Sequence, residues 1–298
     1  MSATFSTEFV LAVFYIVFLS QIYFASIHYP QKLVRRVAYI LDNFPPEEYP
    51  NLYPSVGDGF VGRANRKLGL YSGVNYAIAV FGLVILGFMW ASGYEPALKG
   101  GDEVYVMLYF FLQVIPFLVV SLQDFKHTKK LRERFAQRVR TAELKPRQLF
   151  DFVSPFLVGF AVLSYIAMLV FNLSYDYENQ SQQMNMYLSL GLITLVNLAY
   201  VFVIAHFVKG VKLDPYKDGK DQSKQIESMA KSLTISSIMI SVFLIVAEAA
   251  DRYDIEVFDP AVSSFYMQLC LILGVGLTMR IDKVENMNFD VYKEDVAA

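Results

Sequence analysis

LYSGVNYAIAVFGLVILGFMWASG, residues 70–93, runs for 24 residues without an Asp, Glu, Lys or Arg side chain. As an α-helix it would be ~36 Å long at ~1.5 Å per residue, enough to cross a hydrocarbon core of ~30 Å. A helix also satisfies its interior backbone hydrogen bonds within itself, as a backbone surrounded by lipid must. The stretch therefore predicts a membrane-spanning helix.

Six further stretches of this kind occur, and 55% of the 298 residues are hydrophobic while only 18% are charged, unlike a soluble domain. The predicted spans are residues 9–27, 70–93, 104–122, 152–172, 186–208, 232–249 and 261–279. The first is expected to be retained, because no basic residue precedes it as in a signal peptide. We predict an all-α fold, a polytopic bundle of seven transmembrane helices that forms one transmembrane domain over residues 1–298.

Lysine and arginine are concentrated in alternate connecting segments. Residues 28–69 hold six, 123–151 hold nine, 209–231 hold six and the tail 280–298 holds three, whereas the remaining segments hold only Lys99 and Arg252. Basic residues near span ends resist translocation, so the N-terminus is predicted outside and the C-terminus in the cytoplasm. The expected location is a cell membrane, inner or plasma, with several crossings.

The basic segments are predicted to meet anionic lipid on the cytoplasmic side. After Pro30, apolar side chains recur at helical spacing opposite a cationic face, which predicts an amphipathic interfacial helix that ends near Asp42 and the Pro45-Pro46 pair. A second basic helix, within 123–151, is expected to continue the third span. The cations expected to bind lipid headgroups are Lys32, Arg35, Arg36, Arg63, Arg66, Lys67, Lys129, Lys130 and Arg134. Nucleic acid is not an expected partner, because aromatic residues are not interleaved with these charges.

A strap rich in proline and tyrosine follows the amphipathic helix. Its four prolines in residues 44–54 fix an extended course, and aromatic side chains are spaced along it. Phe44, Tyr49 and Tyr53 are predicted to dock a partner, or else to pack on the chain's own helix ends, because aromatic rings favour burial.

Polar side chains inside the spans are few, and no charged residue lies at a span centre, which argues against proton-coupled and voltage-sensing mechanisms. Two interpretations stay open: a hydroxyl-lined path with an acidic mouth, or an interface of small residues closed by a Glu248–Arg252 pair. Gly69 and Gly73 suit helix packing in the same way. The polar candidates are Thr234, Ser237, Ser241 and Glu248, which share one helical face, together with Gln113, Asn197 and Gln268.

Three histidines and one aspartate fall near the same membrane boundary: His28, Asp124, His127 and His206. Imidazole and carboxylate are ligands of zinc and iron, so a metal site is a hypothesis, although no two of these residues form a recognised ligand pair on one helix. No nucleophile elbow or phosphate loop is present, and no cofactor is expected.

These features favour a non-catalytic integral membrane protein that acts by binding or assembly, with other membrane proteins or with copies of itself. A channel or carrier for a small solute or lipid is the main alternative. An integral membrane enzyme using the histidines at the cytoplasmic interface is a further one.

Overall fold

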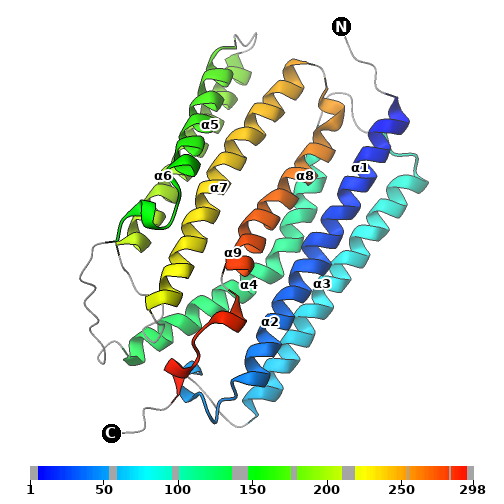
Figure 1. Ribbon diagram of the computed structural model, residues 1–298. Helices are drawn as coiled ribbons and strands as arrows, with labels where there is room; N and C mark the ends of the chain where they lie inside the picture. The colour runs from blue at the N-terminus through cyan, green and yellow to red at the C-terminus, as the bar shows by residue number, and fades with distance from the viewer. Residues whose placement is uncertain are drawn as a thin grey trace.

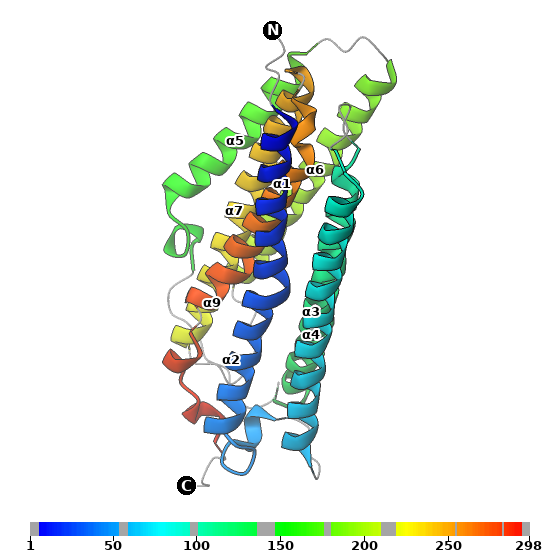
Figure 2. The same cartoon turned by 90° about the vertical axis from the view of Figure 1, so that its right-hand side faces the viewer.

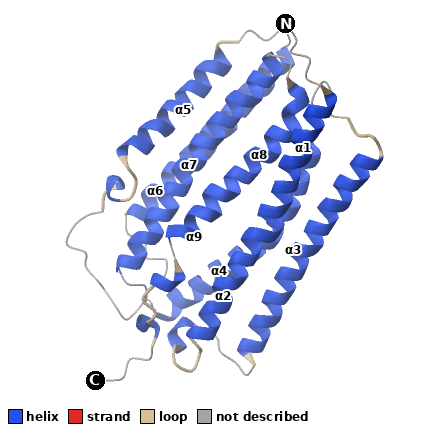
Figure 3. Ribbon diagram, turned by 45° about the vertical axis from the view of Figure 1, so that its right-hand side comes forward, coloured by secondary structure: helices blue, strands red, loops and turns tan. Residues whose placement is uncertain are grey.

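The computed structural model describes residues 6–53, 59–95, 101–135, 147–175, 180–209, 219–253, 255–281 and 283–293. Within these ranges all regular structure is helical, with no strand (Figure 3). Seven helical stretches of this described part are long and apolar enough to cross a membrane, which confirms the predicted number. They are Thr7–Asn43, Phe60–Ala91, Glu103–Lys130, Pro155–Leu173, Gln182–Val208, Gly219–Arg252 and Glu256–Asn286. The direction in which they cross stays a prediction.

The first span is longer than its apolar stretch. Helix α1 (Thr7–Ile22) passes through a π-helical turn, η1 (Tyr23–His28), directly into α2 (Tyr29–Asn43). At the junction Tyr29 N–H donates to Phe24 O, five residues earlier, and Pro30 occupies the first turn of α2, where its missing N–H costs little. The amphipathic segment therefore continues the line of the first span (Figure 2) instead of forming a separate helix at the interface. It ends at Asn43, before Pro45-Pro46, as expected.

The other spans are α3 (Phe60–Ala91), α4 (Glu103–Phe135), α5 (Pro155–Leu173), α6 (Gln180–Val208), α7 (Gly219–Arg252) and α8 (Asp259–Leu271). A second π-helical turn, η5 (Ile272–Gly276), joins α8 to α9 (Leu277–Ile281). The described residues also form five short 3₁₀ turns: η2 (Pro50–Leu52), η3 (Leu149–Asp151), η4 (Glu256–Phe258), η6 (Val284–Asn286) and η7 (Asp290–Tyr292).

Two helix limits follow local chemistry. Helix α5 begins at Pro155, three residues later than its predicted span, because Ser154 Oγ accepts a hydrogen bond from Leu157 N at 3.2 Å and proline suits the first helical position. Helix α4 continues beyond the apolar stretch to Phe135, so the described residues of the basic segment up to that point extend the third span. Residues 136–146 of that segment lie outside the described residues.

The helices form two groups (Figure 1). Helices α1, α3 and α4 enclose a core that includes Phe14, Phe18, Ile78 and Tyr109, while α5, α6 and α7 form a second group around Met168. Helices α7 and α8 lie side by side and join the groups. We call the end of the bundle that holds α2, the first turns of α3 and α7, and η7 the basic end; α1 begins at the opposite end (Figure 1).

Candidate functional site

A hydrogen-bonded network of amide and hydroxyl side chains lies inside the first group of helices. We call it the amide network. Its members are Ser20 and Gln21 of α1, Ser26 of η1, Gln113 of α4, and Ser264 and Gln268 of α8. Ser264 Oγ donates to Gln21 Oε1 over 2.6 Å, and Gln21 Nε2 donates to Gln113 Oε1 over 2.9 Å. Gln113 Nε2 then donates to Ser26 Oγ over 2.9 Å. The network therefore links three helices across the bundle.

Gln268, the one glutamine of α8, ties this helix to α1. Ser20 Oγ donates to Gln268 Oε1 over 2.7 Å, and Gln268 Nε2 donates to Val17 O over 2.8 Å. Gln21 is fully buried, and Gln113 and Gln268 are each 3% exposed. Buried amides without partners would cost free energy, so these bonds fix how the helices are rotated against one another. None of these amides and hydroxyls titrates near neutral pH, so the network holds helices together and is not suited to acid–base chemistry.

The polar candidates on α6 and α7 bond to each other and to their own helices. Ser237 Oγ donates to Asn197 Oδ1 at 2.5 Å and so joins α7 to α6. Thr234 Oγ1 donates to Ala230 O at 2.8 Å, and Ser241 Oγ donates to Ser237 O at 3.0 Å, both within α7. Each of these hydroxyls therefore has a partner inside the chain.

Small side chains cover the contact between α5 and α7, the most extensive contact between two helices in the described structure. Ala230, Thr234 and Ser241 are buried on α7, and Ala161 and Ser164 are buried on α5. Small residues let two helices approach closely in a membrane. The buried small side chains of α7 agree with the interpretation of this face as a helix interface, and that interpretation stays a prediction.

A salt bridge lies at the C-terminal end of α7, away from the basic end of the bundle. Arg252 Nε lies 3.2 Å from Glu248 Oε1, and an Arg252 terminal nitrogen donates to Phe171 O over 2.9 Å. The guanidinium also lies 4.1 Å from the centre of the Phe171 ring and 4.3 Å from that of Tyr175. Aromatic rings attract cations in this geometry, so Arg252 fastens α7 to the end of α5.

The seven polar candidates thus occupy four places: the amide network, the α6–α7 contact, the buried face of α7 that holds Thr234 and Ser241, and this ion pair. Comparisons with protein-family models, with curated proteins and with solved structures found no match for the chain.

Each of the three histidines contacts an aromatic ring or a backbone carbonyl group of this chain. The rings of His28 and Tyr29 meet edge to face, and His206 stacks on Phe202. His127 Nε2 lies 3.2 Å from Leu52 O. In the described ranges no three His, Cys, Asp or Glu side chains are grouped so that they could hold a metal ion. The structure therefore does not bring the four residues of the metal hypothesis (His28, Asp124, His127 and His206) together.

The aromatic residues of the strap pack against the chain's own C-terminal segment. Phe44 stacks on Phe289 with ring centres 3.8 Å apart, and Tyr49 is 7% exposed. Tyr53 OH donates to Phe44 O over 2.7 Å, and burial together with the charge of Glu47 raises the pKa of Tyr53 to about 12. Phe44, Tyr49 and Tyr53 are thus engaged within the chain in this structure. The interpretation as packing on the chain itself accounts for them better than docking of a partner, because Phe44 and Tyr49 pack with the tail and Tyr53 contacts Phe60 at the start of α3.

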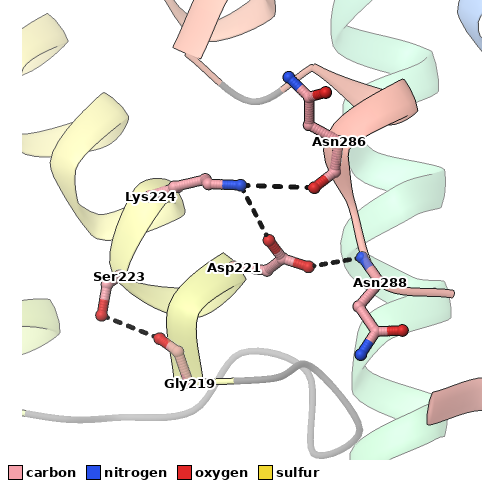
Figure 4. A network of polar contacts seen from close by, with 6 residues as sticks. All are labelled: Gly219, Asp221, Ser223, Lys224, Asn286 and Asn288. Carbon is pink, nitrogen blue, oxygen red and sulfur yellow. Dashed lines mark hydrogen bonds and ion pairs between the residues drawn. The ribbon is translucent and has the colours of Figure 1, made fainter. Parts of the chain in front are cut away.

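Asp221, in the first turn of α7, binds the same C-terminal segment (Figure 4). Its carboxylate accepts a hydrogen bond from Asn288 N at 2.8 Å and lies 3.2 Å from Lys224 Nζ. Lys224 Nζ in turn donates to Asn286 O over 3.4 Å, while Ser223 Oγ donates to Gly219 O over 2.9 Å within α7. The carboxylate therefore holds the tail against α7.

Replacing Asp221 by alanine is expected to release the C-terminal segment locally while leaving the spans folded. The bond to Asn288 N is charge-assisted and nearly buried, so its loss should favour the open tail by about 1–2 kcal/mol, or roughly 5- to 30-fold in population. Chymotrypsin should then cleave after the buried ring of Tyr292 faster by a similar factor.

Asp290→Ala is the matched control, because Asp290 is an exposed carboxylate of the same segment, paired only with the exposed Lys293 among the described groups. This change should alter cleavage little. Equal cleavage rates for Asp221→Ala and the unchanged chain would show that Asp221 does not hold the tail.

The nine cations expected to bind lipid sit in α2, α3 and α4 near the basic end. Lys32, Arg35, Arg66, Lys67 and Lys130 are exposed. Arg63 and Lys129 are exposed as well, Arg36 is half-buried, and the side chain of Arg134 lies outside the described residues. Their contact with lipid stays a prediction.

Four members of the amide network are not among the polar candidates predicted from the sequence: Ser20, Gln21, Ser26 and Ser264. Gln21, Ser26 and Ser264 join the amide network, although alone they are ordinary polar residues in apolar stretches. The only signal available was that Gln21 and Gln113 are long amides inside spans, where a polar group needs a partner.

Proposed function

We propose that this chain is a non-catalytic integral membrane protein that acts by assembly, with a second copy of itself or with another membrane protein, through the outward face of α3. The observation that carries the proposal is a row of small residues on that face, Gly69, Gly73 and Ala77, all exposed and spaced four residues apart. A methyl group added at Gly69 or Gly73 would meet no atom within 4 Å. Within this chain, therefore, neither glycine is required by a contact.

Another glycine of α3 provides the contrast. At Gly82 an added methyl carbon would lie 2.1 Å from the hydroxyl oxygen of Tyr109, so this glycine is needed for packing against α4. Helix α3 thus has one glycine packed inside the chain and a separate open row near its basic end. Rows of small residues at intervals of four let a second membrane helix approach closely, and lipid tails gain no comparable contact.

Cysteine cross-linking tests the assembly. In a Cys270→Ser background, which removes the one native cysteine, Ala77→Cys is expected to give a disulfide-linked product when native membranes are oxidised. A product of twice the chain's mass identifies a second copy, and any other mass identifies a different subunit. Adding Gly73→Ile should reduce the yield by about tenfold or more, the equivalent of ~1.4 kcal/mol, because the branched side chain separates the helices.

Gly191→Ile on α6 is the matched control, since this glycine is also open to its surroundings but lies on another helix. It should leave the cross-linked yield unchanged. Absence of any cross-linked product, or equal losses from Gly73→Ile and Gly191→Ile, would contradict assembly through α3.

Two observations support assembly over the alternative of a channel or carrier. Gln113 and Gln268 form hydrogen bonds within the amide network, and Ser237 donates a hydrogen bond to Asn197. These polar groups therefore bind one helix to another. The enzyme alternative draws no support from the separated histidines described above.

A further inference from the structure

An open cleft of about 710 Å³ lies at the basic end, between the start of α2 and the segment that contains η5 and α9. One part of its wall is cationic and includes Lys32, Arg280 and Lys283; Glu285 is its one described carboxylate. Three cations and one carboxylate leave a net charge of +2 on the described lining.

Among the residues that the structure describes, these three cations differ from their neighbours in having no ionic partner. Lys224 pairs with Asp221, and Lys231 pairs with Glu227 at 2.5 Å. By contrast, no described side chain forms an ion pair or a hydrogen bond with Lys32, Arg280 or Lys283, and all three are exposed. The cleft therefore concentrates uncompensated positive charge, which favours an anion.

The other part of the wall is apolar. Ile272, Leu273, Leu277 and Met279 line it and are half-buried, so hydrocarbon can lie against them. A ligand that fits both parts has an anionic head and an apolar body. This favours a lipid over a free anion, and the position beside a membrane-spanning segment allows entry from the bilayer.

A tyrosine residue also lines the cleft. Tyr29 is only 9% exposed, lines the cleft, and has no hydrogen-bond partner among the described residues. Its ring lies over Gly276, where an added methyl carbon would come within 2.6 Å of the hydroxyl oxygen. Both π-helical turns, η1 and η5, end beside this contact, and such turns are frequent at functional sites. Gly276 thus makes room for a hydroxyl that can donate to a ligand.

We propose that this cleft binds the phosphate headgroup of an anionic phospholipid, with Lys32, Arg280 and Lys283 around the phosphate and an acyl chain against Leu273 and Leu277. The site is independent of the pairing of α3. The cationic residues bind the phosphate of the ligand, and the apolar wall favours a ligand that also has an acyl chain.

Binding can be measured with the full chain in nanodiscs of phosphatidylcholine, using fluorescent phosphatidylglycerol as the probe. The unchanged chain is expected to prefer phosphatidylglycerol to phosphatidylcholine by at least about tenfold, and the variant Lys32→Gln/Arg280→Gln/Lys283→Gln is expected to lose that preference. Tyr29→Phe, which removes only the hydroxyl, should weaken binding by about fivefold.

The matched control is Lys126→Gln/Lys209→Gln/Lys220→Gln, which removes the same charge from exposed positions that lie outside the cleft and are not among the nine cations expected to bind lipid. It should retain most of the preference. All six side chains are exposed, so both variants should keep the fold, and a circular dichroism spectrum checks this. Equal losses in the two variants would overturn the site, because the attraction would then be a general property of the surface.

Competition with inorganic phosphate distinguishes a site for a lipid headgroup from a site for free phosphate. At millimolar concentration it should displace the fluorescent lipid weakly or not at all, because it cannot use the apolar wall. Displacement by inorganic phosphate as effective as that by unlabelled phosphatidylglycerol would overturn the assignment to a lipid.

Discussion

Replacing Gln21 by alanine is expected to lower the free energy of unfolding by about 2–4 kcal/mol. Gln21 is fully buried and bridges Ser264 Oγ and Gln113 Oε1. Its truncation removes the acceptor of the Ser264 hydroxyl proton and the donor to Gln113 Oε1, and it opens a cavity between α1, α4 and α8. Reversible unfolding in mixed micelles measures the loss.

Two further variants distinguish the effect of the cavity from the effect of the lost hydrogen bonds. Gln21→Leu fills the cavity without restoring the hydrogen bonds, so it should recover only part of the stability. The double variant Gln21→Leu/Gln113→Leu should be less unstable than the sum of its single changes, because both ends of one bond have been removed together.

Gln183→Ala is the control for the loss of a glutamine, since Gln183 is exposed at the start of α6 and has one long contact, 3.5 Å, with Tyr187 OH. It should change the free energy of unfolding by less than about 0.5 kcal/mol. A Gln21→Ala chain as stable as this control would mean that the amide network does not hold the helices.

Gly82→Ala is expected to cost about 2–3 kcal/mol because no space exists for a methyl group between α3 and α4. The added carbon would lie 2.1 Å from the Tyr109 hydroxyl oxygen, 2.5 Å from Cζ of that ring and 3.0 Å from Ile22 Cδ1. The phenol would have to move and give up its bond to Ile78 O, which is 2.9 Å long. The same unfolding measurement applies.

Gly87→Ala, on the same helix, supplies the control, because a methyl group there meets no atom within 4 Å. It should be neutral or stabilising by up to ~1 kcal/mol through helix propensity. Adding Tyr109→Phe to Gly82→Ala removes the closest clashing atom and should recover part of the loss. Equal effects of Gly82→Ala and Gly87→Ala would rule out a close α3–α4 contact.

The positions of the spans were predictable because lipid imposes a local rule. A backbone in hydrocarbon must be helical, so length and polarity alone located the seven stretches, as residues 70–93 illustrate. Some ends were also local matters: the Pro45-Pro46 pair follows the end of α2, and Ser154 with Pro155 begins α5. The salt bridge of Glu248 with Arg252 was predictable as well, since it joins neighbouring turns of one helix.

Most of the candidate sites were not predictable, since their residues meet only through packing. The aromatic side chains of the strap lie against a tail more than 200 residues away, so the sequence left two interpretations open. In the sequence Arg280 and Lys283 are ordinary cations of the tail. Only the tertiary structure places them with Tyr29 in one cleft.

Helicity, the number of spans and the grouping of basic residues follow from the sequence by itself, because each depends on neighbours within one or two dozen residues. Tertiary structure alone decided that Gln21 meets Ser264 across 243 positions of chain, and that Gly82 is packed while Gly69 and Gly73 stay open. The physical reason is rotation. A hydropathy pattern states that a helix crosses the membrane, but the angle at which it turns a given side chain toward a neighbour depends on the packing and hydrogen bonds of all the helices together.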